Sequence, residues 1–119
     1  MPSRILCVDD NEVALRARKL VLESVGHQVQ TAVTATLARQ LIAAQPFDLA
    51  IVDYYLDGIH GNELAAELKA YCSSMAVILL SGADGLENLD RVDSFVHKCD
   101  GPQALLNEIE RLVGQTRCP

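Results

Sequence analysis

The run Leu49-Ala50-Ile51-Val52-Asp53 constrains the fold of this 119-residue chain more than any other segment. A short continuous apolar run, rich in β-branched residues, is typical of a strand buried on both faces of a sheet. Sheets of this kind bind their ligands just beyond the carboxyl ends of their strands. Because the run ends at a carboxylate, Asp53 is the first candidate functional residue.

Four other segments have the length and composition of strands. Arg4–Val8 and Ala76–Leu80 are apolar, whereas Gln28–Ala32 alternates polar and apolar residues, as a half-exposed edge strand does. Ser94–His97 is a shorter candidate. Together with the run that ends at Asp53, these segments predict five strands.

Segments with helical periodicity separate the predicted strands. Thr34 or Thr36 can cap a helix that ends before Pro46, residues 62–72 are amphipathic, and Pro102 suits the first turn of the last helix. Strand and helix alternate five times, which predicts one α/β domain spanning the whole chain (1–119), with a doubly wound parallel sheet and helices on both faces.

The first predicted helix covers residues 12–25. Its apolar positions are close to helical spacing and predict the buried face: Val13, Ala14, Ala17, Leu20, Val21 and Val25. The opposite face carries Arg16, Arg18 and Lys19 beside Leu15 and Leu22. We interpret that face as solvent-exposed, with a docking surface for an acidic partner as the alternative.

Composition restricts the function classes. The chain has a formal net charge of −6, which disfavours direct binding to nucleic acid. It contains no apolar run long enough to cross a membrane and does not begin like a signal peptide. The four cysteines have no metal-ligand spacing and favour a reducing compartment. We therefore expect a cytoplasmic domain without membrane contact.

Four of the five predicted strands end in, or are followed by, side chains that can take part in catalysis or metal binding: Asp9 and Asp10, Asp53, Ser81 and Lys98. Because parallel strands end at one edge of a sheet, we expect these five residues to converge there. Singly, each has an ordinary explanation, such as a helix cap for Asp9 or Asp10 and a turn for Ser81. Their joint occurrence indicates a functional site.

The residue types at this edge suggest its chemistry. Crowded carboxylates repel one another unless a cation lies between them, and a site of oxygen ligands suits Mg²⁺. A carboxylate beside a metal ion, an ammonium group and a hydroxyl suits the transfer of a phosphoryl group. We identify Asp53 as the acceptor because it ends the central, most buried strand.

These residues resemble the receiver domain of two-component response regulators over essentially the whole chain. The matching segments are 5–11, 48–53, Leu56 with 59–61, 81–82 and 95–98. The resemblance implies a flavodoxin-like (βα)5 sandwich of three layers with sheet order 2-1-3-4-5. It also implies a phosphoacceptor signalling domain of a phosphorelay, which is a switch rather than an enzyme with a separate substrate.

The resemblance also implies a role for each site residue. Asp53 accepts a phosphoryl group from a phosphohistidine on a histidine kinase or histidine phosphotransfer protein. Asp10 and Asp53 bind Mg²⁺ directly, Asp9 binds it largely through water, and the backbone carbonyl of Tyr55 completes the protein ligands. In this family the first helix commonly docks the histidine donor, which favours a docking role for Leu15 and its neighbours.

Two further residues complete the implied switch. Lys98 and Ser81 contact the phosphoryl group, and Phe95 changes rotamer together with Ser81.

The chain departs from the family pattern at three places. Asp57 and Cys99 stand where the family usually has proline, so we expect an altered metal loop and a trans bond after Lys98. The interval between Ser81 and Lys98 is shorter than usual, and residues 86–92 leave two helical turns at best. We expect a short or irregular fourth helix and loss or remodelling of the usual dimer through that face.

The sequence fits other functions less well. A binding module that no longer signals by phosphorylation usually lacks part of the residue set. A haloacid-dehalogenase-type phosphatase would have a second aspartate where Tyr55 stands, and neither a P-loop nor a flavodoxin phosphate loop is present. The start and end of the chain mildly favour a stand-alone protein over a domain of a longer regulator or hybrid kinase.

Overall fold

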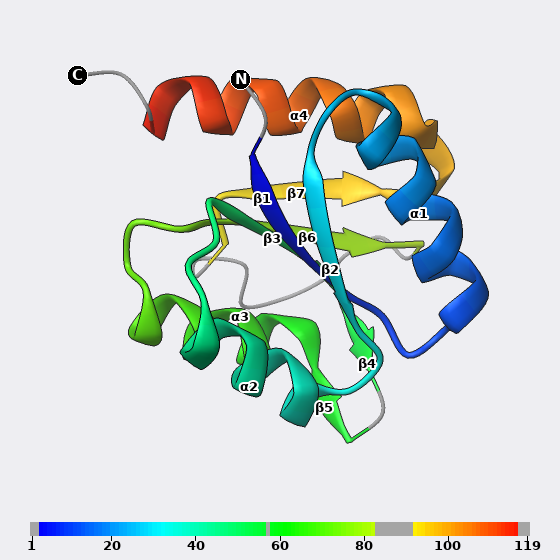
Figure 1. The fold of residues 1–119 in the computed structure, drawn as a ribbon. Helices are drawn as coiled ribbons and strands as arrows, with labels where there is room; N and C mark the ends of the chain where they lie inside the picture. The colour runs from blue at the N-terminus through cyan, green and yellow to red at the C-terminus, as the bar shows by residue number, and fades with distance from the viewer. Residues whose placement is uncertain (1–2, 57, 83–91, 117–119) are drawn as a thin grey trace.

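Five parallel strands form the centre of the molecule. The computed structural model describes residues 3–56, 58–82 and 92–116. The strands are β1 (Arg4–Val8), β2 (Gln28–Ala32), β3 (Leu49–Asp53), β6 (Ala76–Ser81) and β7 (Ser94–His97), in the order β2-β1-β3-β6-β7 (Figure 1). Counted along the main sheet, this is the predicted order 2-1-3-4-5. The predicted bounds of β1, β2, β3 and β7 are confirmed, and β6 extends one residue further, to Ser81.

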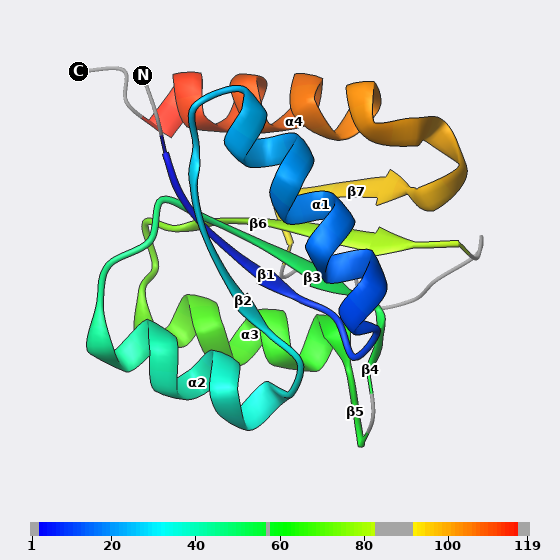
Figure 2. The same cartoon turned by 45° about the vertical axis from the view of Figure 1, so that its right-hand side comes forward.

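Helices cover both faces of the sheet and complete three layers (Figures 1 and 2). One face carries α1 (Glu12–Ser24) and α4 (Gly101–Thr116), and the other carries α2 (Ala35–Ala44) and α3 (Gly61–Tyr71). The predicted doubly wound α/β class is therefore confirmed.

The strands supply both halves of the core because successive side chains point to opposite faces. Ile5, Cys7 and Ile51 pack with α1 and α4, whereas Leu6 and Val52 pack with α2 and α3. Every residue of β3 is buried. Burial of one such aliphatic side chain contributes roughly 1.5–3 kcal/mol, so these short strands hold the sheet edge in place.

Helix α1 buries a different face from the one predicted. Leu15 and Leu22 are 2% and 0% exposed, whereas Val13 and Leu20 are 76% and 70% exposed. The prediction counted six apolar residues along the helix; two of them are alanines, which fit either face, and Val13 and Leu20 lie on the exposed side. Two long leucines seven residues apart define the buried face instead. Leu15 therefore cannot be a docking residue, since it lies in the core.

The other helices follow their predictions closely. Thr34 caps α2 by accepting a hydrogen bond from the Leu37 N–H at 3.1 Å. Helix α3 begins at Gly61 and ends before Cys72, within one residue of the predicted range 62–72 at each end, and its Tyr71 is 66% exposed. Helix α4 has Pro102 in its first turn, as predicted, and buries Leu105, Ile109, Leu112 and Val113, with Leu106 partly buried.

A small antiparallel hairpin was not predicted. It pairs β4 (Tyr55–Leu56) with β5 (Ile59–His60) just after β3. The predicted trans bond after Lys98 is confirmed, since the structure contains no cis peptide bond among the residues it describes. The predictions for Asp57, for the short fourth helix and for the dimer face that it forms lie outside the described residues.

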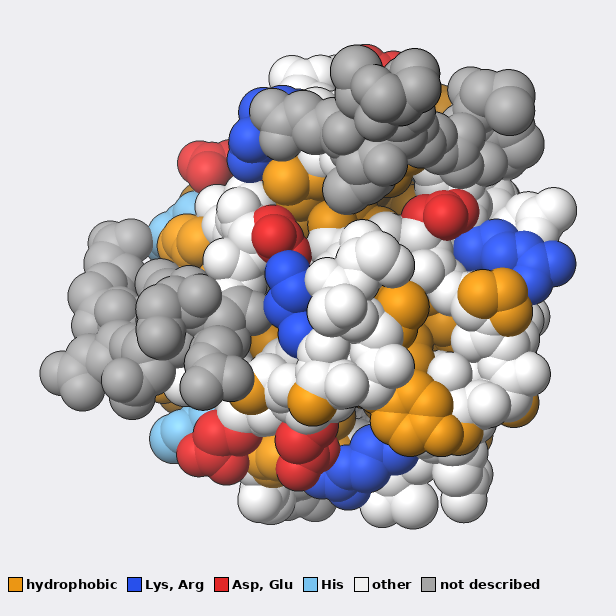
Figure 3. All heavy atoms as spheres, turned by 90° about the vertical axis from the view of Figure 1, so that its left-hand side faces the viewer, with side chains coloured by type: hydrophobic (Ala, Val, Ile, Leu, Met, Phe, Trp, Pro, Cys, Tyr) orange, Lys and Arg blue, Asp and Glu red, His pale blue; other side chains and the backbone are white. Residues whose placement is uncertain are grey.

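At the amino ends of the strands, the surface carries side chains of both charges. Figure 3 views this side of the molecule, where positive and negative side chains are interspersed. Lys69 and Asp93 form an ion pair at 2.6 Å, and the same carboxylate accepts a hydrogen bond from the Val77 N–H. Within the described ranges, no helix has the length and hydrophobicity to cross a bilayer.

Candidate functional site

Three carboxylates meet at the carboxyl edge of the sheet, as predicted. Asp9 follows β1 and Asp53 ends β3, and these strands are parallel neighbours in which Val8 pairs with Val52. Asp9 is 1% and Asp53 5% exposed, whereas Asp10 is exposed. One oxygen of each carboxylate lies within 4.8 Å of the others.

Backbone hydrogen bonds hold Asp9 in place. Its N–H donates to the Ala32 carbonyl at 3.1 Å, and its Oδ1 accepts from the Asn11 N–H at 3.0 Å. The cap of α1 is Asn11, whose side chain accepts from the Ala14 N–H. The alternative explanation of Asp9 or Asp10 as the helix cap is therefore wrong, and both carboxylates remain available for other chemistry.

The chain around Asp53 is held by a close backbone approach. The Tyr54 N–H donates to the Leu80 carbonyl at 2.9 Å, and the Gly61 N–H donates to the Tyr54 carbonyl at 2.6 Å. A Cβ at position 61 would collide with the Asp53 carbonyl oxygen and come within 2.8 Å of the Tyr54 Cα. Only glycine allows the hairpin to return this closely to the end of β3.

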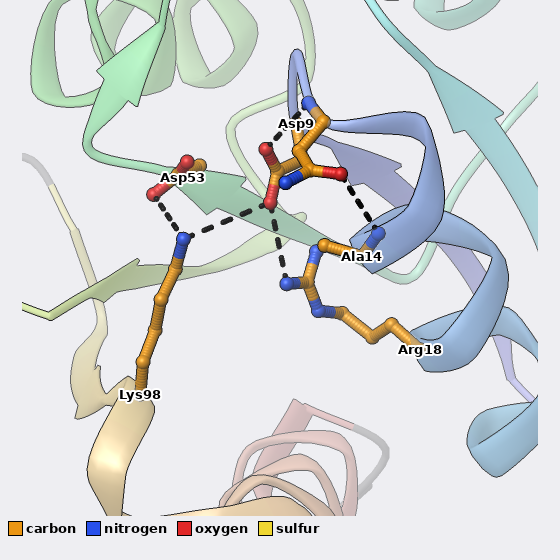
Figure 4. A network of polar contacts seen from close by, with 6 residues as sticks. Asp9, Ala14, Arg18, Asp53 and Lys98 are labelled. Carbon is orange, nitrogen blue, oxygen red and sulfur yellow. Dashed lines mark hydrogen bonds and ion pairs between the residues drawn. The ribbon is translucent and has the colours of Figure 1, made fainter.

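Lys98 extends from the end of β7 into the same cluster (Figure 4). Its Nζ lies 3.2 Å from Asp53 Oδ1 and 3.8 Å from Asp9 Oδ2. The lysine is the first residue of the short 3₁₀ helix η1 (Lys98–Asp100), and its side chain is 39% exposed. The predicted meeting of Lys98 with the acidic residues is therefore present in the structure.

The electrostatics of Asp53 favour a cation at this edge. Burial raises the pKa of the Asp53 carboxyl, the neighbouring Asp9 raises it further, and Lys98 opposes both effects. An ionised Asp53 is therefore not fully compensated by the side chains around it. A site of three carboxylates with a surplus of negative charge fits Mg²⁺, which prefers oxygen ligands and retains several waters.

The remaining predicted residues have different environments. Ser81 is fully buried at the end of β6, beside Asp53 in the sheet order. Phe95 is half-buried on β7 and packs toward the α2 and α3 side of the core. Tyr55 lies on β4 with its side chain 53% exposed. Ser81 therefore lies at the predicted edge of the sheet, on the strand next to β3, and Phe95 lies on the following strand, β7.

One residue of this site was not predicted. Arg18 of α1 places Nη2 3.3 Å from Asp9 Oδ2, and its side chain is only 11% exposed (Figure 4). The sequence contained a signal for it: Leu15, Arg18 and Leu22 have the i, i+3, i+7 spacing of one helix face. Because two of these three residues are leucines, the arginine between them must also point inward.

Comparison with known proteins identifies the family. The model of the response regulator receiver domain matches residues 5–110. The Pseudomonas aeruginosa alginate biosynthesis transcriptional regulatory protein AlgB is 30% identical over 115 residues, which cover 92% of this chain and 26% of that protein. The P. aeruginosa transcriptional regulatory protein AruR is 29% identical, with 98% of this chain and 52% of that protein covered. The chain thus spans about a quarter to a half of these relatives.

Solved structures agree with this result. A CheY-like receiver domain protein from Methanospirillum hungatei has a TM-score of 0.91 at 30% identity, covering 98% of this chain and 97% of that one. The response regulator TrrA from Thermotoga maritima, solved in complex with Mg²⁺-BeF, has a TM-score of 0.86 at 27% identity, covering 94% and 99%.

The chain belongs to the receiver domain family of two-component response regulators. Receiver domains are signalling switches rather than classical enzymes, and they generally bind Mg²⁺ at an acidic pocket. The cluster of Asp9, Asp10 and Asp53 has the position and the composition of such a pocket.

Proposed function

We propose that Asp53 is the phosphoacceptor and that the surrounding residues form a magnesium-dependent phosphorylation site. The observation that carries the proposal is the placement of a buried Asp53 between two further carboxylates and the Lys98 ammonium. TrrA, a structural neighbour, was solved with Mg²⁺-BeF, which supports the assignment by analogy.

The proposed reaction transfers a phosphoryl group from a phosphohistidine. An Asp53 carboxylate oxygen forms a bond to phosphorus, the donor's N–P bond breaks, and the electron pair stays on the leaving imidazole, which takes up a proton. Lys98 neutralises charge on the phosphoryl oxygens and lies near enough to Asp53 to do so. Asp9, Asp10, Asp53 and the Tyr55 backbone carbonyl would hold a Mg²⁺ ion, which would supply further charge neutralisation.

The conformational response is proposed to run from Ser81 to Phe95. Ser81 shares the carboxyl edge with Asp53, and its hydroxyl is the proposed hydrogen-bond donor to a phosphoryl oxygen. Phe95 lies on the neighbouring strand β7, so it is the proposed second residue of the switch. The proposed donor partner is a histidine kinase or histidine phosphotransfer protein.

An intact-mass measurement tests this function. The chain is incubated with a small acyl phosphate and Mg²⁺, and the fraction carrying one added phosphoryl group is measured, with EDTA as the metal control. Asp53→Asn should abolish the adduct. Asp48→Asn is a matched control. Asp48 directly precedes β3, at the end of the strand opposite Asp53, and its carboxylate accepts a hydrogen bond from the Arg4 N–H.

The outcomes separate the proposal from its alternatives. An adduct on the wild type and on Asp48→Asn, but not on Asp53→Asn, supports the function. An adduct that survives in Asp53→Asn contradicts the acceptor assignment. The lack of any adduct with every donor and divalent metal would favour a binding module that does not signal by phosphorylation.

A further inference from the structure

We propose that Arg18 is a built-in counter-cation of the acidic site, which competes with the divalent cation for Asp9 and so weakens metal binding. This inference rests on the magnesium site of the proposed function. It assigns a role to a residue of α1 whose partner is a proposed metal ligand.

The position of Arg18 shows that its contact with Asp9 is not a surface ion pair. The residue lies on the buried face of α1, between Leu15 and Leu22, and Nη2 lies 3.3 Å from Asp9 Oδ2. Nη1 is buried and has no hydrogen-bond partner among the described residues. A buried, incompletely bonded guanidinium is unfavourable. The one charged partner it has in the described residues, Asp9, therefore holds it in place.

The charges at the site explain the effect on a metal ion. Three carboxylates face two cations, Arg18 and Lys98, which leaves a single net negative charge. With Lys98 alone, two negative charges would remain. Arginine side chains keep their charge in proteins. Because the Arg18 side chain is only slightly exposed, solvent screens its charge little. A divalent cation therefore binds a less negative site than the three aspartates suggest.

Space for the displaced side chain is present beside the site. A hollow of about 340 Å³ lies between α1 and the start of α4, and its lining includes Arg18, Lys98, Pro102 and Leu105. The guanidinium can turn into this hollow when a cation takes over Asp9. Because linkage between two ligands of one site is reciprocal, any group that draws Arg18 away from Asp9 raises the affinity for the metal.

A titration with Mg²⁺ alone, without a phosphodonor, tests this competition. The dissociation constant is measured by the fluorescence of the tyrosines, two of which (Tyr54 and Tyr55) directly follow Asp53, in a chain without tryptophan. Arg18→Met keeps the long side chain and removes the charge. Arg16→Met makes the same change on an exposed position of the same helix and serves as the matched control.

We expect Arg18→Met to bind Mg²⁺ roughly tenfold more tightly than the wild type, since a charge in contact with a carboxylate commonly changes its affinity for a cation by that much. Arg16→Met should change the affinity less than about twofold, because an exposed charge is screened. Arg18→Lys should remain close to the wild type. Equal affinities for Arg18→Met and Arg16→Met would overturn the inference and leave the proposed function intact.

A second measurement needs no substitution in α1 and covers the case in which Arg18→Met does not fold. The guanidinium NMR signals of Arg18 in the wild type should shift during the titration with the same midpoint as the signals of Asp53. Signals of Arg18 that do not move while the metal binds would contradict the competition. A wild type that does not bind Mg²⁺ at all would overturn both the metal site and this inference.

Discussion

Strand β3 ends at the acidic site and helix α1 begins beside it. The sequence predicted the burial of β3 correctly but predicted the wrong buried side for α1. Strand β3 is buried at all five residues, so no choice of face was needed. Helix α1 buries one side only, so its prediction depends on choosing the residues that pack against the sheet. A fully apolar run is therefore safe evidence for a central strand, whereas in a helix with apolar residues on both sides a few long side chains determine which side is buried.

The most severe test of this comparison is truncation of one buried residue from each element. Ile51→Ala in β3 and Leu22→Ala in α1 should each lower the free energy of unfolding by about 2–5 kcal/mol, because both side chains are fully buried. Urea denaturation followed by circular dichroism measures the change. A cost for Leu22→Ala well below that range would mean that α1 is not packed as described.

A smaller effect is expected where β3 meets the hairpin. Gly61→Ala should destabilise the protein by about 1–3 kcal/mol, because its Cβ would press on the backbone of Asp53 and Tyr54. Chemical denaturation measures this change, and Gly82→Ala is the control, since a Cβ there would have no neighbour within 4 Å. Equal effects of the two substitutions would show that the close approach is not required.

The electrostatics of Asp53 predict a gain in stability when its charge is removed. Burial and Asp9 raise its pKa in the folded state, so the folded chain binds the proton more tightly than the unfolded chain. The stability of the wild type should therefore fall, relative to Asp53→Asn, as the pH rises above the ordinary carboxyl pKa. In EDTA near pH 7, thermal unfolding should show a Tm a few degrees higher for Asp53→Asn.

The smallest effect is expected on the exposed side of α1. Leu20→Ala and Val13→Ala should change the free energy of unfolding by less than about 0.5 kcal/mol, since both side chains are mostly exposed. Set beside Leu22→Ala in the same denaturation experiment, they complete the comparison of the two helix faces. If Leu20→Ala lowered the free energy of unfolding by about 2 kcal/mol or more, the side of α1 predicted from its apolar residues would be the buried one after all.

The predictable part of the fold was the part governed by strands. Five segments with strand-like patterns, four of them followed by chemically reactive side chains, were enough to predict the sheet and the meeting of Asp9, Asp53 and Lys98, because parallel strands place their carboxyl ends together. The order of the strands came from the family resemblance, since short apolar runs carry no information about which strands are neighbours.

The features missed by the sequence prediction depend on side chains with two possible environments. Arg18 was assigned to the solvent-facing side because it lies opposite the counted apolar residues, with other basic residues beside it, whereas its spacing from Leu15 and Leu22 places it on the buried side. The hairpin of β4 and β5 has strands of two residues each, too short to give a pattern of alternation. The hairpin therefore depends on contacts made only in the folded chain, whereas the burial of Arg18 could have been inferred from its spacing.

The location of the phosphoryl group tests the central claim most directly. After incubation with a small acyl phosphate and Mg²⁺, the acyl phosphate on the protein is trapped by reduction, and the modified residue is identified by peptide mass spectrometry. The account predicts one modified residue, Asp53, with modification lost in EDTA. Modification at Asp9, Asp10 or Ser81 with Asp53 unmodified would contradict it.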